Sequence, residues 1–254
     1  MTAILEQTER LAELIREAGS VVALTGAGIS VPSGIPDFRT PGTGLWANVD
    51  PMEVAHIDAF RRDPERFWCF YGERFQTLED KRPNLAHEAL ADLERAGLLD
   101  AVITQNIDRL HARAGSRELI EVHGTIAHSS CLSCRAQYPL ADVRARQTFD
   151  AAGIPRCDCG QPLKPDVVLF GEYLPADALA RAEQLAEAAD LMLCIGSSLE
   201  VYPVAQLPAT TLAAGGKIAI LTQGRTPFDS RAAVRCSGDV VDELSGVIGA
   251  LHLR

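Results

Sequence analysis

A short apolar segment followed by closely spaced glycines is the feature that most constrains the fold of this 254-residue chain. Residues 21–24 are Val-Val-Ala-Leu, which is typical of a strand buried on both faces of a sheet. Gly26 and Gly28 follow, and glycine allows a sharp turn and a close approach of a ligand's phosphates to backbone N–H groups. The segment therefore predicts the first strand and turn of a nucleotide-binding α/β sheet. The third glycine of the dinucleotide fingerprint is missing, so ordinary turn chemistry stays an alternative for these glycines.

Other apolar segments predict further strands that alternate with helices. Strands are expected at residues 101–104, 118–122, 191–195, 217–221 and 239–241. Helices are expected at residues 1–19, 64–78, 84–95, 176–189 and 241–251. This alternation is typical of an α/β fold with a parallel, Rossmann-like sheet.

Two interruptions of this pattern predict a second, smaller domain. The Rossmann-like domain is expected to consist of residues 1–37, 86–124 and 166–254. The small domain is expected to consist of residues 38–85, a helical insert, and residues 125–165, a cysteine-rich module.

Composition excludes several classes of protein. Hydrophobic residues make up 47% of the chain, which suits a packed core, and the net charge of −10 disfavours binding to nucleic acid. Residues 1–19 show one apolar helix face and no basic segment followed by an apolar core, so we expect a surface helix and not a signal peptide. No apolar run approaches the length of a membrane span. We therefore expect a cytoplasmic monomer that binds neither nucleic acid nor membranes.

Four of the seven cysteines lie close together in the chain and indicate a metal site. Cys131 and Cys134 form one short pair, and Cys157 and Cys159 form a second. Zinc prefers four such ligands in a tetrahedron, and two pairs across a hairpin would supply them to a structural site. Ordinary buried cysteines are the alternative. Because only Asp158 separates the second pair, whether Cys159 completes the site is left open.

The glycine-rich segment resembles the sirtuin family when it is read with three later motifs. These motifs are Thr104-Gln105-Asn106-Ile107-Asp108, His123-Gly124 and Gly196-Ser197-Ser198, and they follow the family's order over nearly the whole chain. The resemblance is to NAD-dependent protein lysine deacylases of the bacterial and archaeal type. It implies NAD and Zn²⁺ as cofactors and acylated lysine side chains of proteins as substrates. The implied products are free lysine, nicotinamide and O-acyl-ADP-ribose.

The resemblance also assigns the catalytic residues. His123 would take a proton from a ribose hydroxyl, and an imidazole titrates near neutral pH, as a general base should. The alternative for a lone histidine is a hydrogen-bonded position in the core. Asn106 and Asp108 match positions that hold the ribose and the nicotinamide carboxamide, to which an amide and a carboxylate can hydrogen-bond.

The implied cofactor-binding residues come from several strand ends. They are Gly26, Ala27, Gly28, Val31, Asp37, Phe38, Arg39, Gln105, Asn106, Ile107, Asp108, Gly196, Ser197, Ser198, Thr222 and Val240. Thr222 stands where the family has an asparagine near the adenine ribose, so that contact is in doubt.

Two further sets of residues concern the substrate. Val168, Phe170, Gly171 and Val201 match the edges between which the family clamps an extended peptide, a form of strand addition. Tyr71 and Arg74 align with the pair that binds the terminal carboxylate of the acyl group in desuccinylating and demalonylating sirtuins. A guanidinium and a phenol can both hydrogen-bond to a carboxylate. Packing of the tyrosine and solvation of the arginine are the alternative. We expect a deacetylase, with acidic deacylation as its rival.

Three other functions use the same residues and stay open. A mono-ADP-ribosyltransferase would pass the ribose to a protein side chain, and a NAD hydrolase would release nicotinamide without acylated peptide. A non-catalytic NAD-binding or zinc module would not need His123.

Overall fold

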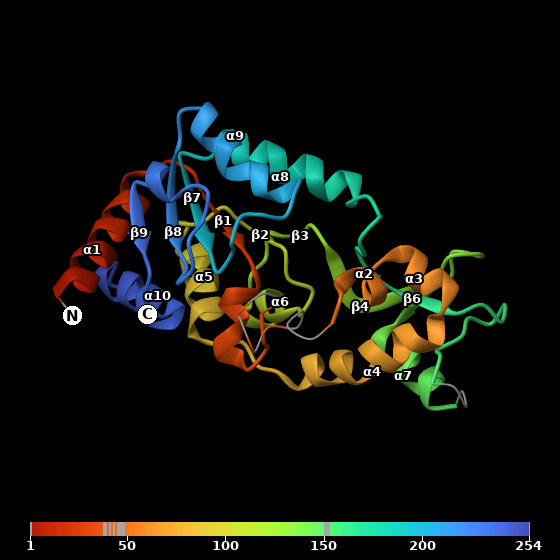
Figure 1. Cartoon of the computed structure of the whole chain (residues 1–254). Coiled ribbons are helices and arrows are strands. Elements are labelled where there is room, and N and C mark those ends of the chain that lie inside the picture. Colours follow the sequence, from red (N-terminus) through yellow and green to blue (C-terminus); the bar gives the residue numbers. More distant parts are fainter. Residues whose placement is uncertain are drawn as a thin grey trace.

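A six-stranded parallel sheet forms the larger part of the molecule (Figure 1). The computed structural model describes residues 2–37, 40, 42, 44, 49–149 and 153–253. The strands are β1 (Val21–Thr25), β2 (Ala101–Thr104), β3 (Leu119–Glu121), β7 (Leu191–Ile195), β8 (Lys217–Leu221) and β9 (Val234–Cys236). Their order is β3-β2-β1-β7-β8-β9, so β1 and β7 lie side by side at the point where the chain reverses its direction across the sheet. Both are fully buried and carry no charged residue, as the apolar sequence predicts.

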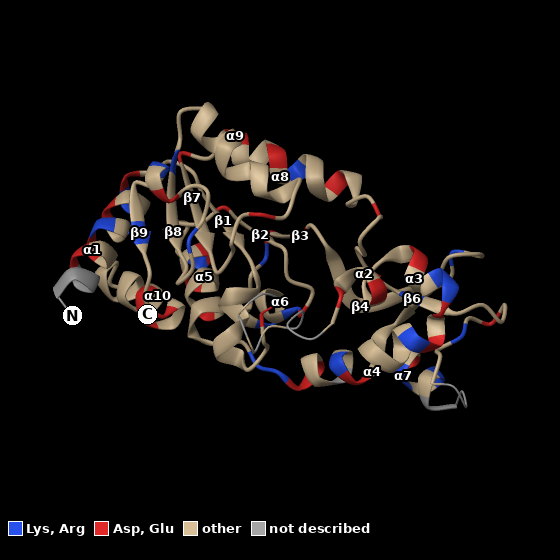
Figure 2. Ribbon diagram, viewed as in Figure 1, with Lys and Arg blue, Asp and Glu red and all other residues tan. Residues whose placement is uncertain are grey.

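Helices cover both faces of this sheet (Figure 1). Helices α1 (Thr2–Glu17), α5 (Leu85–Arg95) and α10 (Val240–Ala250) pack on one face, with the short helix α6 (Leu110–Ala114) close to α5. Helices α8 (Ala176–Ala188) and α9 (Leu207–Ala213) pack on the other. Charged residues of both signs lie on helices and loops around the apolar strands (Figure 2). Two hydrophobic clusters result, one on each side of the sheet.

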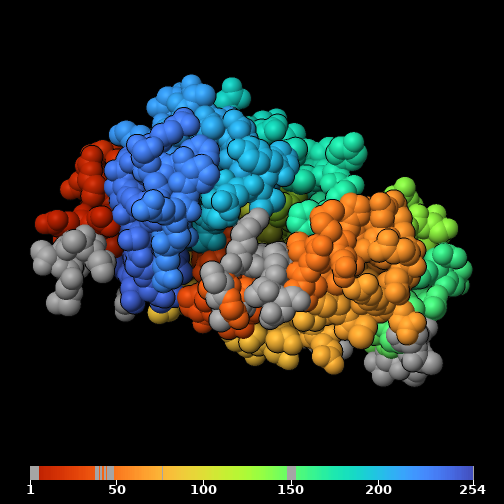
Figure 3. Space-filling view, viewed as in Figure 1, coloured from red at the N-terminus to blue at the C-terminus, as the bar shows by residue number. Residues whose placement is uncertain are grey.

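A second sheet and a group of helices make a separate module beside the large sheet (Figures 1 and 3). Strands β4 (Gly124–Cys131), β5 (Gln137–Pro139) and β6 (Leu163–Val167) form an antiparallel sheet in the order β5-β4-β6. Helices α2 (Pro51–Val54), α3 (Ile57–Arg62), α4 (Pro64–Asp80) and α7 (Leu140–Phe149) surround it. We refer to these strands and helices as the small module.

One hydrophobic cluster joins the two chain segments of the small module. Aromatic side chains of α4 pack against residues of β4 and β6. The indole N–H of Trp68 donates to the carbonyl of Leu163, at 2.9 Å. The helical insert and the cysteine-rich segment therefore share one core. The domain boundaries expected from the sequence stay a prediction.

The expected strand at residues 239–241 is wrong. The last strand is β9, and residues 240 and 241 begin helix α10. The carboxylate of Asp239 accepts hydrogen bonds from the N–H groups of Val241 and Asp242, which is the geometry of a helix N-cap. Val240 then packs inward against the first hydrophobic cluster. An apolar pair after an aspartate thus marks a helix start here and not a strand.

Across the described residues, no helix combines the length and the apolar character that crossing a bilayer requires.

Candidate functional site

The turn after β1 and the turn after β7 are in backbone contact at the carboxyl edge of the large sheet. Gly26 N–H donates to the Ile195 carbonyl at 2.9 Å, and Gly28 N–H donates to the Gly196 carbonyl at 2.8 Å. A Cβ atom on Gly28 would lie 2.7 Å from Gly196 Cα, so only glycine fits this approach. The glycines therefore join two loops where ligands of open α/β sheets bind. Their approach to phosphates stays a prediction.

A buried polar network connects the segment after β1 with the residues that follow β2. The Ser30 hydroxyl donates to Asp108 Oδ2 at 2.7 Å. The Asn106 amide donates to Ser30 Oγ at 3.2 Å and to the Gly26 carbonyl at 3.1 Å. Burial raises the pKa of Asp108, against the opposing effect of the Leu110 N–H and the Ser30 hydroxyl. The network thus presents an amide and a carboxyl group in fixed orientations, as binding of a carboxamide requires.

His123 lies between the two sheets, just before β4 begins. Its Nδ1 is 3.1 Å from the Gln105 carbonyl oxygen. A carbonyl only accepts hydrogen bonds, so Nδ1 carries the proton and the neutral ring has its lone pair on Nε2. No hydrogen bond from another described residue engages Nε2. Burial lowers the pKa of His123, partly offset by the Gln105 carbonyl. The ring is therefore neutral at pH 7 and able to accept a proton.

Two further histidines are buried behind the polar network. The rings of His87 and His111 have centroids 4.8 Å apart. His111 Nε2 lies 2.9 Å from Thr25 Oγ1, and His87 Nε2 lies 3.4 Å from Ser30 Oγ. Burial lowers the pKa of His87 to about 4 and that of His111 to about 3. Ser30 was not among the residues predicted from the sequence, although it follows the glycine turn directly.

The remaining cofactor residues are only partly brought together. Gln105 Nε2 donates to Ser197 Oγ at 2.8 Å, which connects the ends of β2 and β7. Asp37 accepts hydrogen bonds from the backbone and hydroxyl of Thr40. Phe38 and Arg39 lie outside the described residues. The cofactor roles of these residues and of Ala27, Val31, Ile107, Ser198 and Val240 stay predictions.

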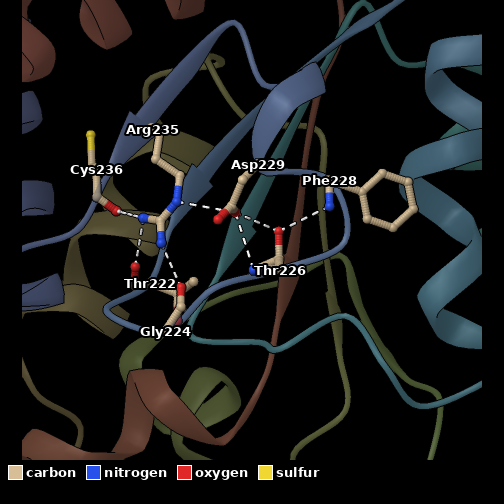
Figure 4. A network of polar contacts seen from close by, with 7 residues as sticks. All are labelled: Thr222, Gly224, Thr226, Phe228, Asp229, Arg235 and Cys236. Atoms are coloured by element: carbon tan, nitrogen blue, oxygen red, sulfur yellow. Dashed lines mark hydrogen bonds and ion pairs between the residues drawn. The ribbon is translucent and has the colours of Figure 1, made fainter.

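Arg235 is a residue at this edge that sequence reasoning missed. It projects from β9 into the loop of residues 222–229 (Figure 4). Its guanidinium donates to the carbonyls of Thr222, Gly224 and Cys236, at 2.7, 2.5 and 2.8 Å, and pairs with Asp229 at 3.1 Å. The carboxylate of Asp229 in turn accepts from the N–H and hydroxyl of Thr226. A lone arginine in a short strand belongs to no sequence motif, so nothing in the sequence indicated that Arg235 holds this loop.

The predicted peptide clamp has one edge tied to the small module. Phe170 N–H donates to the Ala55 carbonyl, and the Phe170 carbonyl accepts from Ile57 N–H, both at 2.9 Å. Val168 N–H donates to the His123 carbonyl at 2.8 Å. This edge thus leads directly from the small module to the proposed catalytic histidine. Gly171 and Val201 stay predictions for peptide binding.

Tyr71 and Arg74 lie on α4 in different environments. Tyr71 is buried among aromatic rings, and its ring stacks on Phe75 with centroids 5.3 Å apart; burial raises its pKa. Arg74 is exposed, with its guanidinium 3.8 Å from the centroid of the Phe70 ring. Their expected role in reading an acidic acyl group stays a prediction.

The four clustered cysteines fit a zinc site. The sulfur atoms of Cys131, Cys134, Cys157 and Cys159 all lie within 4.8 Å of one another, and two of the pairs are 3.5 and 3.4 Å apart. A tetrahedron with Zn–S bonds of about 2.3 Å needs sulfur separations of roughly 3.8 Å. Cys159 therefore joins the cluster despite the shortened second pair. The Cys159 N–H and the Tyr138 hydroxyl lower the pKa of Cys157 to about 6, which favours the thiolate that binds metal.

Comparisons with known proteins agree with this geometry. Residues 26–203 match the Sir2 family. The chain is 48% identical to an NAD-dependent protein deacetylase of Sulfolobus acidocaldarius over 229 residues, which cover 90% of this chain and 89% of that protein. It is 46% identical to an NAD-dependent protein deacetylase of Thermotoga maritima over 231 residues, which cover 91% and 92%.

Solved structures of Sir2 proteins have the same fold. A Sir2 structure with a deacetylated p53 peptide and 3'-O-acetyl-ADP-ribose has a TM-score of 0.93 and 43% identity, over 98% of this chain and all of that one. A Sir2 structure with a p53 peptide and NAD⁺ has a TM-score of 0.87 and 45% identity, over 94% and 96%. One with a propionylated peptide has a TM-score of 0.88 and 43% identity, over 96% and 99%.

Proposed function

Because the chain belongs to the Sir2 family and is an NAD-dependent protein deacetylase, we propose that it removes acetyl groups from lysine side chains with His123 as general base. The observation that supports this role is the hydrogen bond of His123 Nδ1 to the Gln105 carbonyl, which orients the ring and leaves Nε2 to accept a proton. NAD, when bound, supplies the ribose that accepts the acetyl group. The lowered pKa keeps the imidazole in its basic form at neutral pH.

Asn106, Asp108 and Ser30 would hold the nicotinamide end of NAD. Asn106 and Asp108 are buried at the end of β2, and hydrogen bonds to Ser30 fix both side chains before any ligand binds. Such preorganisation lowers the cost of ordering the site around the carboxamide. Gln105, bonded to Ser197, would lie between this end of the cofactor and the loop after β7.

The substrate would be an extended acetylated peptide. Solved relatives hold p53 and propionylated peptides, and we extend this peptide binding to the edge formed by Val168, Phe170 and Gly171 and to Val201 opposite. Main-chain hydrogen bonds to an added strand bind many sequences, because side chains contribute little to them. We accordingly propose a class of substrates, acylated lysines in flexible segments, and no single preferred peptide sequence around the lysine.

Substitution His123→Ala tests the proposed role. We expect deacetylated peptide and O-acetyl-ADP-ribose, both measured by mass spectrometry, to form at least about 100-fold more slowly. Because the proton transfer follows the departure of nicotinamide, exchange of labelled nicotinamide into NAD should persist. His252→Ala, which changes an exposed histidine, is the control and should behave as the wild type.

Other outcomes identify the competing functions. Unchanged deacetylation by His123→Ala would exclude this histidine as the base. Transfer of ADP-ribose to a target protein without acyl loss would indicate an ADP-ribosyltransferase. Nicotinamide release without any acylated peptide would indicate NAD hydrolysis.

A further inference from the structure

The order of strands in the large sheet indicates how an extended dinucleotide must lie across it. The chain reverses direction between β1 and β7, and ligands bind in the crevice at such a switch point. Under the proposed function, the nicotinamide end lies over β2, beside Asn106 and Asp108. The adenosine end must then extend to the opposite side of the crevice, over the ends of β7 and β8. The loop that follows β8 is therefore next to the adenosine end.

The loop after β8 begins beside the turn after β7, which itself contacts the glycine turn at Gly28. Gly196 N–H donates to the Leu221 carbonyl at 2.8 Å, and Thr222 N–H donates to the Cys236 carbonyl at 3.1 Å. Thr222 thus lies at the carboxyl edge, between the ends of β7 and β9. Residues 222–228 form no helix or strand, so hydrogen bonds and side-chain packing must fix their positions.

Arg235 makes several of the hydrogen bonds that hold this loop in place. One half-buried guanidinium holds two carbonyls of the loop, those of Thr222 and Gly224, and a third carbonyl at the end of β9 (Figure 4). Its ion pair with Asp229 closes the far end of the loop, where Asp229 also accepts from Thr226. A planar guanidinium with five donors can satisfy this set at once, whereas a lysine ammonium cannot.

We propose that Arg235 is a positioning residue for the adenosine end of NAD. It holds the loop of residues 222–229 in the conformation that borders the adenosine, so that binding NAD does not have to order this loop. Its hydrogen bonds and ion pair involve none of the residues assigned to the reaction or to the peptide edge, so its effect should be confined to cofactor affinity. This inference rests on the proposed function, because that function sets the direction in which NAD lies.

Substitution Arg235→Met tests the proposal, because it should change the KM for NAD and leave kcat and the KM for peptide unchanged. We expect KM for NAD to rise about tenfold, because the loop must be ordered at each binding event. The kcat and the KM for acetylated peptide should stay within about twofold of the wild type. Titration with ADP-ribose, which carries the adenosine end, should show the same tenfold weakening, and inhibition by nicotinamide should not change.

Two more variants keep the test decisive. Arg235→Lys retains the charge but not the planar fork, and we expect it to weaken ADP-ribose binding nearly as much. If Arg235→Met does not fold, Asp229→Asn disturbs the same network with the arginine in place and should weaken ADP-ribose binding severalfold. Arg181→Met is the control, because Arg181 forms an exposed ion pair with Glu118 on another part of the surface. It should leave every constant unchanged.

The failures of the two proposals are distinguishable. An unchanged affinity of Arg235→Met for ADP-ribose, or a loss of kcat at constant KM, would overturn the role of Arg235 alone. Persistent deacetylation by His123→Ala would overturn the proposed base, while the ADP-ribose titrations of Arg235→Met would still report on the loop.

Discussion

His87 and His111 are buried in the neutral form, which couples the stability of the fold to pH. Their pKa values, about 4 and about 3, lie below the value of about 6.5 expected for an unfolded histidine. Below pH 6.5 the unfolded state therefore binds more protons than the folded state. Their contribution to stability is complete above pH 6.5 and is lost as the pH falls towards the folded pKa values.

We predict that the free energy of unfolding, measured with urea, falls between pH 6.5 and 5 by about 2 kcal/mol for each of these histidines. His87→Gln removes one titrating group and keeps a polar side chain. Its unfolding free energy should fall by about 2 kcal/mol less over the same range. His252→Gln is the control, and an equal fall in all three proteins would contradict the prediction.

Arg74 provides a second prediction at the scale of single residues. If Arg74 reads a terminal carboxylate, Arg74→Met should lower kcat/KM for succinyl-lysine peptide by at least about tenfold, the effect of one lost charge-assisted hydrogen bond. Turnover of acetyl-lysine peptide, which has no such carboxylate, should change little. A panel of acetyl, propionyl, malonyl and succinyl peptides measures this. Equal losses on all four would exclude Arg74 from that role.

Single residues also show where sequence reasoning about the site stopped. Asn106, Asp108 and His123 could be found because each follows a strand in a recognisable motif. Ser30, which bonds to the first two, could not, because these partners lie 78 and 76 residues away in the chain. Arg235 could not, because most of its partners are backbone carbonyls, which carry no sequence signal. Contacts between distant side chains depend on strand order, which the local pattern does not reveal.

At the scale of secondary structure, β6 and the segment after it are held by an ion pair between a buried lysine and a partly exposed glutamate. Lys164 is 7% exposed, and its ammonium group lies 2.9 Å from Glu172 and 2.8 Å from the Val167 carbonyl. Glu172 also accepts from Leu169 N–H. The pair thus closes a loop around the predicted peptide edge.

We predict that Lys164→Met lowers the free energy of unfolding by about 2 kcal/mol, because it leaves the partly exposed Glu172 carboxylate without its cation and the Val167 carbonyl without its donor. The double variant Lys164→Met/Glu172→Gln should recover part of this loss. Lys217→Met, at an exposed lysine, is the matched control. Urea unfolding measures all three, and a loss in the first variant no larger than in the control would contradict the prediction.

Elements of the large sheet were predictable to within a few residues. The strands at 101–104, 191–195 and 217–221 have the predicted bounds, because apolar segments of this length have one compatible location in a parallel sheet. The last strand was not predictable, since β9 has only three residues, one of which is the polar Arg235. The small module gave weak signals, because its short antiparallel strands depend on contacts with α4 and on the cysteines.

At the scale of the whole molecule, the two parts of the structure should respond differently to removal of metal. The small module has its own hydrophobic cluster, and the four cysteines lie at one end of its sheet. Structural zinc contributes directly to the folding free energy of such modules. The large sheet has two clusters that contain none of these cysteines.

We predict that a zinc chelator exposes the small module and preserves the large sheet. Hydrogen exchange followed by mass spectrometry should show protection lost in residues 124–167 and in α4, and kept in β1 and β7. Cys134→Ser should reproduce this pattern without chelator, whereas Cys69→Ser, at an exposed cysteine outside the cluster, should not. Equal loss of protection in both sheets would show that they unfold as one unit.

The indole of Trp68 has a practical consequence. It is 2% exposed, and its N–H is bonded to the Leu163 carbonyl at the start of β6. The chain has one other tryptophan, Trp46, which lies outside the described residues. Emission from Trp68 should shift to longer wavelength when water reaches the ring. In a Trp46→Phe background, this intrinsic fluorophore would allow the opening of the small module to be followed in real time without a label.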